Sequence, residues 1–177
     1  HEAWWQVFCC GEGFPNIMSE RRQKVRAWNQ YFTPSIDAHA LMDVTKGILA
    51  EMGKSPSVWV EPAAGAGAIC SLFPNNISLS VCIEVDPMLC DKYGWYNHNF
   101  LTLSRAEILQ ISGNFSMSLP AKDDVVVVTN PPFVEYSESD DGEPTRDGAL
   151  AAKFVRHSLQ LGNIVVMLLP ERFTKQE

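Results

Sequence analysis

The chain has 177 residues and a mass of 19.8 kDa, a length that suits one well-buried domain and not two. Its composition, 46% hydrophobic and 20% charged, predicts a globular protein, and no apolar run reaches the roughly 20 residues that a membrane-spanning helix needs. A net charge of −7 argues against a protein that binds long duplex nucleic acid by itself, because that affinity depends on neutralising phosphates. A short substrate or a protein partner remains compatible with this charge.

The five cysteines are odd in number and form no C-x-x-C pair, so we expect neither a disulfide framework nor a zinc site. Cys70 and Cys82 lie in apolar surroundings and are interpreted as small buried hydrophobic residues. The four histidines are scattered without metal-ligand spacing, which predicts no metal centre. This pattern favours a reducing intracellular compartment, the cytoplasm or the nucleus.

Residues 1–30 form an aromatic and basic segment, and the main domain is expected over residues 31–177. Its first feature is Tyr31-Phe32-Thr33-Pro34, in which Thr33 is predicted to cap a helix and Pro34 to take the first helical position. Apolar residues then recur at helical spacing up to the stop signal at Gly53. The residues of this predicted half-buried face are Ile36, Ala40, Leu41, Val44, Ile48 and Met52.

A short strand at 58–60 leads into Glu61-Pro62-Ala63-Ala64-Gly65-Ala66-Gly67-Ala68, which we expect to turn into a helix. Small residues there allow a ligand to approach the main chain, and Gly65 can adopt a positive φ without strain. A dinucleotide-binding loop is an alternative, but that pattern requires glycine at the position of Cys70.

A second strand at 79–83 ends in Glu84-Val85-Asp86-Pro87. A carboxylate just past the second strand is where nucleotide-binding folds hold ribose hydroxyls, which favours Glu84 for this role. Asp86 before Pro87 is equally well interpreted as a helix cap. Farther on, a third element is expected around Trp95 to Leu103 and contains Asn99-Phe100-Leu101, although Asn97 to Asn99 is equally well interpreted as a simple polar loop.

The run Val125-Val126-Val127-Val128-Thr129 predicts a strand buried on both faces, the kind found in parallel sheets. It leads directly into Asn130-Pro131-Pro132-Phe133, where the two prolines end the ladder of hydrogen bonds. The Asn130 carboxamide oxygen, the Pro131 carbonyl and the Phe133 ring offer two acceptors and a stacking surface. Together they suit a flat group that carries an NH2.

After an acidic segment at 136–147, the pattern predicts a helix over 148–161 and a buried strand over 164–169. Strands that alternate with helices predict an α/β fold, a doubly wound and mostly parallel sheet with ligands at the carboxyl ends of its strands.

The ordered set of motifs resembles the S-adenosylmethionine-dependent amino-methyltransferases that carry an NPPF motif, the adenine-modifying type in particular. The resemblance covers about residues 31–173 and implies their Rossmann-like fold, without the closing strands that follow in that family. It implies catalytic roles for Asn130, Pro131, Pro132 and Phe133. It also implies that S-adenosyl-L-methionine is bound by Thr33, Glu61, Ala63, Gly65, Gly67, Glu84, Val85, Asn99 and Phe100.

Within this set, the resemblance places Glu61 near the amino group of the cofactor, Glu84 on its ribose and Val85 against its adenine. Asn99 stands where the family commonly has Asp, so this position carries no charge. The implied substrate is an exocyclic amine, adenine in DNA or RNA. A glutamine amide in protein and a catalytically silent scaffold remain alternatives, and a protein partner is expected to supply substrate recognition.

Overall fold

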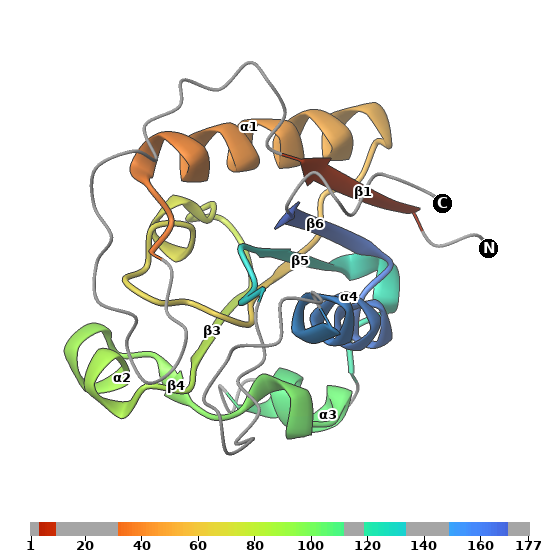
Figure 1. Cartoon of the computed structure of the whole chain (residues 1–177). Coiled ribbons are helices and arrows are strands. Elements are labelled where there is room, and N and C mark those ends of the chain that lie inside the picture. Colours follow the sequence, from red (N-terminus) through yellow and green to blue (C-terminus); the bar gives the residue numbers. More distant parts are fainter. Residues whose placement is uncertain (1–3, 10–31, 112–118, 134–148, 170–177) are drawn as a thin grey trace.

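The computed structural model describes residues 4–9, 32–111, 119–133 and 149–169. Within these ranges the strands form one sheet in the order β1-β6-β5-β2-β3-β4, and every pairing is parallel (Figure 1). The strands are β1 (Trp4–Cys9), β2 (Val58–Glu61), β3 (Leu79–Glu84), β4 (Tyr96–Asn97), β5 (Val125–Thr129) and β6 (Ile164–Leu169). The α-helices are α1 (Ser35–Glu51), α2 (Pro87–Tyr93), α3 (Arg105–Gln110) and α4 (Ala149–Leu161). The 3-10 helices are η2 (Cys70–Leu72), η3 (Phe100–Thr102) and η4 (Lys122–Asp124).

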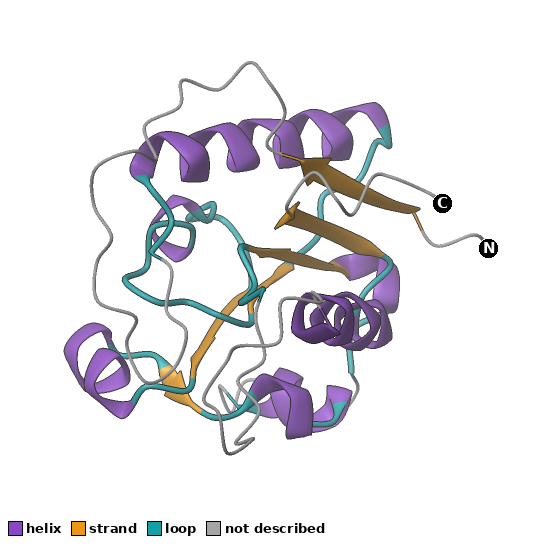
Figure 2. Cartoon of the chain, viewed as in Figure 1, coloured by secondary structure: helices purple, strands orange, loops and turns teal. Residues whose placement is uncertain are grey.

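Helices cover both faces of the sheet, with α1 on one face and α3 and α4 on the other (Figure 2). The side chains of β5 alternate between the two layers of core. Val125 and Val127 belong to the cluster that includes Ala151 and Phe154 of α4. Val126 and Val128 belong to the cluster under α1. The predicted doubly wound α/β fold and the predicted fully buried strand are therefore confirmed.

The helix predicted after Pro34 is present as α1, but two details of the prediction are wrong. Pro34 is the residue before the helix, and no side chain caps it. The buried face consists of Ala38, Leu41, Met42, Thr45 and Leu49, the face that meets β5, β6 and η2. Ile36 lies two residues before Ala38, about 200° around the helix, and is 56% exposed.

The prediction of a helix after residues 61–68, the glycine loop, is also wrong. Only the single turn η2 forms there. Pro74 follows Phe73 and forces that residue out of helical geometry, with φ −61° and ψ 144°. Few residues are then left between Gly67 and Phe73 in which a longer helix could form.

Strand β1 comes from the segment 1–30 and pairs along its whole length with β6. The expected division of the chain at residue 30 stays a prediction, although this strand belongs to the sheet. The basic run at 21–26 and the acidic segment at 136–147 lie outside the described residues. None of the described helices is long and apolar enough to cross a bilayer.

Cys82 is buried as predicted and Cys70 is half-buried, but the expectation of no disulfide is wrong, since the two form one with their Cα atoms 6.5 Å apart. Their spacing in sequence gives no sign of this, because η2 and β3 meet only after the β2–β3 crossover has folded. Cys90 is a free, buried cysteine. The expected reducing compartment stays a prediction, and the disulfide does not favour it.

Candidate functional site

The sheet reverses its direction of winding between β2 and β5. From β2 the chain adds β3 and β4 on one side, and from β5 it adds β6 on the other. In open α/β sheets this reversal leaves a crevice at the carboxyl ends of the strands, where ligands bind. Glu61 ends β2, Glu84 ends β3 and Asn130 follows β5, so the predicted residues meet at this edge.

The loop after β2 is held to the neighbouring strand by main-chain bonds. The Ala64 N–H donates to the Ile83 carbonyl over 2.9 Å, and the Gly67 N–H donates to the Ala64 carbonyl over 2.8 Å. Gly65 and Gly67 have φ of +51° and +82°, values that strain residues with a side chain. Ala63 packs against the core and holds the start of the loop in place.

The Glu84 carboxylate accepts hydrogen bonds from three main-chain N–H groups. Oε2 accepts from Gly65 over 2.8 Å, and Oε1 accepts from Val85 and Asp86 over 2.8 and 2.9 Å. A carboxylate has about four lone-pair sites, so one site remains for a hydroxyl group of a ligand. Val85 beside it is 39% exposed, which leaves an apolar surface at the crevice.

Asp86 caps α2, because its Oδ1 accepts from the Met88 N–H over 2.9 Å and Pro87 takes the first helical position. The helix-cap interpretation of this residue is therefore confirmed.

Glu61 is 2% exposed and lies beneath the glycine loop. Burial raises the pKa of its carboxyl group well above the ordinary value of 4.5, the Cys70 main-chain N–H lowers it, and the nearby Glu84 charge raises it. A compensating partner, such as the ammonium group of a ligand, would therefore stabilise the charged form of this carboxyl group.

Asn99 and Phe100 follow β4 at the same edge. The Asn99 Oδ1 accepts from the Leu101 N–H over 3.1 Å and so caps η3, while the residue itself is exposed. The Phe100 ring is buried and contacts Phe154 and His157. A ligand contact at Phe100 is therefore restricted to its main chain.

Asn130 is linked to the start of α1, 97 residues earlier in the chain. Its Nδ2 donates to Thr33 Oγ1 over 3.1 Å. Its Oδ1 is buried and has no hydrogen-bond partner among the described residues. Because a buried acceptor without a partner is costly, this oxygen is suited to a donor group on a ligand.

The rest of the NPPF motif follows Asn130 at the carboxyl end of β5. Pro131 is buried, Pro132 and Phe133 are half-buried, and Phe133 packs against the core cluster on the α4 side. The residues that follow, 134–148, lie outside the described ranges.

Two aromatic residues of the site were missed by the sequence interpretation. The Trp95 Nε1–H donates to the Gly65 carbonyl over 3.2 Å, and the Phe32 ring lies 3.6 Å from where a Cβ of Gly65 would be. Neither contact has a sequence signal, because each forms between segments that only the fold brings together.

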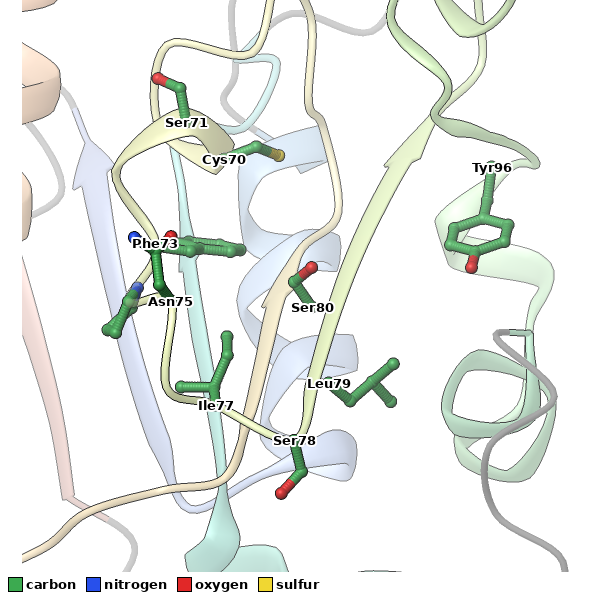
Figure 3. A pocket seen from close by; sticks show the side chains of 10 residues that line it. Cys70, Ser71, Phe73, Asn75, Ile77, Ser78, Leu79, Ser80 and Tyr96 are labelled. Atoms are coloured by element: carbon green, nitrogen blue, oxygen red, sulfur yellow. The ribbon is translucent and has the colours of Figure 1, made fainter.

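A cavity of about 500 Å³ lies elsewhere, between the η2 loop and β3 (Figure 3). Its lining includes Phe73, Ile77 and Ser80 but none of the predicted site residues. In the described part of the chain, no three His, Cys, Asp or Glu side chains are grouped so that they could hold a metal ion.

Comparison with known proteins gives little further information. No protein-family model matches the chain, and no curated protein matches it. Among solved structures, it is similar to a Pyrococcus horikoshii protein provisionally assigned as an RNA methyltransferase, with 19% identity and a TM-score of 0.47. The match covers 82% of this chain and 65% of the other, so this chain spans less than two thirds of that protein's length.

Proposed function

We propose that this chain is an S-adenosylmethionine-dependent methyltransferase that acts on an exocyclic amino group, with adenine in DNA or RNA as the substrate. One observation carries the proposal: at the carboxyl end of β5, Thr33 holds the Asn130 amide, and the buried Oδ1 of Asn130 has no partner among the residues that the structure describes. This acceptor stands at the crevice beside the glycine loop and Glu84, where a cofactor would bind.

The residues present fit this cofactor. Glu84 retains an acceptor site for a ribose hydroxyl, and Val85 offers an exposed apolar side chain for the adenine. The ammonium group of the cofactor would compensate the charge of Glu61, whose pKa is raised by burial. When bound, S-adenosylmethionine supplies an electrophilic methyl group on a sulfonium, which is already a good leaving group.

The task left to this chain is to position the acceptor nitrogen. In a conjugated amine the nitrogen lone pair is delocalised into the ring, which makes the nitrogen a weak nucleophile. Hydrogen bonds from the NH2 to the Asn130 Oδ1 and the Pro131 carbonyl would favour a pyramidal nitrogen whose lone pair is directed at the methyl group. They also stabilise the positive charge that develops on the nitrogen. With the cofactor bound, the methyl carbon would bond to this nitrogen as its bond to the sulfonium breaks, the sulfur would leave as a neutral thioether, and the nitrogen would then lose a proton to water.

Phe133 would stack on the flat substrate base, which has to leave any duplex to reach the crevice beside Asn130. Since the net charge of −7 disfavours strong binding to a duplex, a protein partner would supply part of the recognition of the nucleic acid.

Cofactor binding is tested by calorimetry with S-adenosylmethionine and with its demethylated product. We expect binding to the wild-type chain, and a loss of about 10- to 100-fold in affinity for Glu84→Ala, because hydrogen bonds to a charged group are strong. Absence of binding, or equal affinity for Glu84→Ala, would exclude the proposed cofactor site.

The reaction is tested with cofactor labelled in its methyl group and separate pools of DNA, RNA and protein. We expect label on adenine, and a fall in turnover on the order of 100-fold or more for Asn130→Ala, with cofactor affinity within a few-fold of wild type. The matched control is Asn76→Ala, an exposed asparagine in the turn before β3. Label in glutamine would support the protein substrate instead, and absence of label from all pools would support the silent scaffold.

A further inference from the structure

Trp95, which follows α2 in the chain, contacts the glycine loop at Gly65 and Gly67. Its main-chain N–H donates to the Cys90 carbonyl at the end of this helix, and its ring stacks on Tyr93 with centroids 5.9 Å apart. The indole Nε1–H of Trp95 donates a hydrogen bond to the Gly65 carbonyl over 3.2 Å. The same ring fills the space beside Gly67, where a Cβ would lie 2.6 Å from Cζ2 of Trp95. The absence of a side chain at Gly67 thus makes room for Trp95.

Both main-chain polar groups of Gly65 are therefore held by residues that precede and follow α2 in the chain. Glu84 accepts from its N–H, and Trp95 donates to its carbonyl. In a trans peptide the C=O and the next N–H point in opposite directions, so the bond to Trp95 also fixes the direction of the Ala66 N–H. Ala66 is exposed, and its N–H has no partner among the described residues.

We propose that Trp95 is a positioning residue of the cofactor site, which sets the Gly65–Ala66 peptide so that the Ala66 N–H donates to an acceptor atom of the bound cofactor. The proposal rests on the proposed function, since it concerns the cofactor named there. It predicts that the indole N–H contributes to cofactor affinity without contacting the cofactor itself.

The chain provides a matched control in Trp59. Its indole N–H also donates to a main-chain carbonyl over 3.2 Å, that of Pro56, but this bond lies at the amino end of β2. Trp59→Phe and Trp95→Phe thus remove the same kind of hydrogen bond and keep an aromatic ring. Only the second change loosens the glycine loop.

Binding of S-adenosylmethionine to the full chain is measured by calorimetry for wild type, Trp95→Phe and Trp59→Phe. We expect the Kd to rise about 3- to 10-fold for Trp95→Phe, which is the loss of one hydrogen bond, and to stay within 2-fold for Trp59→Phe. Equal affinity of Trp95→Phe and wild type overturns the inference. Failure of the wild type itself to bind contradicts the proposed cofactor, a distinct outcome that also removes the basis of this inference.

A second measurement covers the case in which Trp95→Phe does not fold. In the wild-type chain with ¹⁵N-labelled tryptophan, the indole signal of Trp95 is expected to shift when the cofactor is added, while that of Trp59 stays in place. The signals are assigned with Trp59→Phe and with Tyr93→Leu, which removes the ring stacked on Trp95. A Trp95 signal that does not move under saturating cofactor contradicts the positioning role.

Discussion

The Asn130 amide can present an acceptor because a second residue fixes its orientation. An amide free to rotate would offer its NH2 as readily as its oxygen. Thr33 Oγ1 accepts from Nδ2 and so directs Oδ1 to the other side. The role of Thr33 is therefore different from the helix cap that the sequence predicts, since this hydroxyl reaches across to β5 and leaves Pro34 uncapped.

The contact between Thr33 and Asn130 is tested by a pair of substitutions. Thr33→Val keeps the shape of the side chain but removes the oxygen, so we expect turnover to fall about 10-fold, the value of one hydrogen bond. Thr33→Ser keeps the oxygen and is expected to retain turnover within about 3-fold. Steady-state rates with the substrate identified by labelling measure both. Equal rates for the valine and serine variants contradict this role of Thr33.

Glu61 gives the chain a dependence of stability on pH. Burial raises its pKa in the folded state above the ordinary value of 4.5, so the folded protein keeps a proton that the unfolded chain loses. Folding then takes up a proton, and this carboxyl group lowers stability as pH rises from about 4.5 to the raised pKa. Below that window the group is protonated in both states and has no effect.

Glu61→Gln isolates this effect, because glutamine is neutral at every pH and its oxygen can still accept from the Cys70 N–H. We expect the variant and the wild type to melt at similar temperatures near pH 4, and the variant to become the more stable one as pH rises, until the difference levels off. Circular dichroism melts from pH 4 to 8 measure this. Two parallel curves across the range would contradict a raised pKa.

At the scale of elements, the β-branched runs predicted strands correctly, and the helical spacing predicted α1 and α4. The face of α1 was less predictable, because the sequence offers Ile36 and Leu41 as equal candidates, and only contact with the sheet decides between them. Helix α3 was missed, although Ser104 and Glu107 form a capping box whose spacing marks the start of a helix.

Substitution of glycine by alanine is expected to have opposite effects in the glycine loop and in helix α1. Gly67→Ala places a Cβ against Trp95 at a φ of +82°, so we expect it to lower the free energy of unfolding by about 1–3 kcal/mol. Gly47→Ala lies on the exposed side of α1 with open space around it, and we expect it to raise the free energy by about 0.5–1 kcal/mol. Urea unfolding measures both changes. A free energy of unfolding for Gly67→Ala that is equal to or above the wild-type value would show that the loop tolerates a side chain at Gly67.

At the scale of the whole molecule, the edge of the sheet that carries the candidate site was predictable, because acids and glycines follow successive strands and parallel strands share their carboxyl edge. The contacts that orient these residues were not. The hydrogen-bonded residues Thr33 and Asn130 are 97 positions apart in sequence, and Trp95 and Gly65 are 30 apart. Such pairs depend on how α1 and α2 pack against the sheet. Strand β1 was unpredicted for the same reason, since its pairing with β6 joins distant parts of the chain.

The disulfide between Cys70 and Cys82 links the η2 turn to β3 and closes a short loop of chain, because the two cysteines are 12 positions apart in sequence. In the chain-entropy model a cross-link over such a loop contributes about 3 kcal/mol, so reductant is expected to lower the melting temperature by roughly 6–12 °C. Cys82→Ala should melt at a temperature that reductant does not change, whereas Cys90→Ala, which keeps the pair, should respond as wild type does.

Alkylation of the unfolded chain without reductant provides the independent measurement. We expect the peptide that carries Cys90 to be labelled, and the peptides that carry Cys70 and Cys82 to be labelled only after reduction. Reduction would also restore a thiol on Cys70, whose sulfur lies 3.0 Å from Oε2 of Glu61 and could then donate to it. Complete labelling of both cysteines without reductant, together with a melting temperature that reductant leaves unchanged, would show that the pair is a pair of thiols, and the reducing compartment would then be the better expectation.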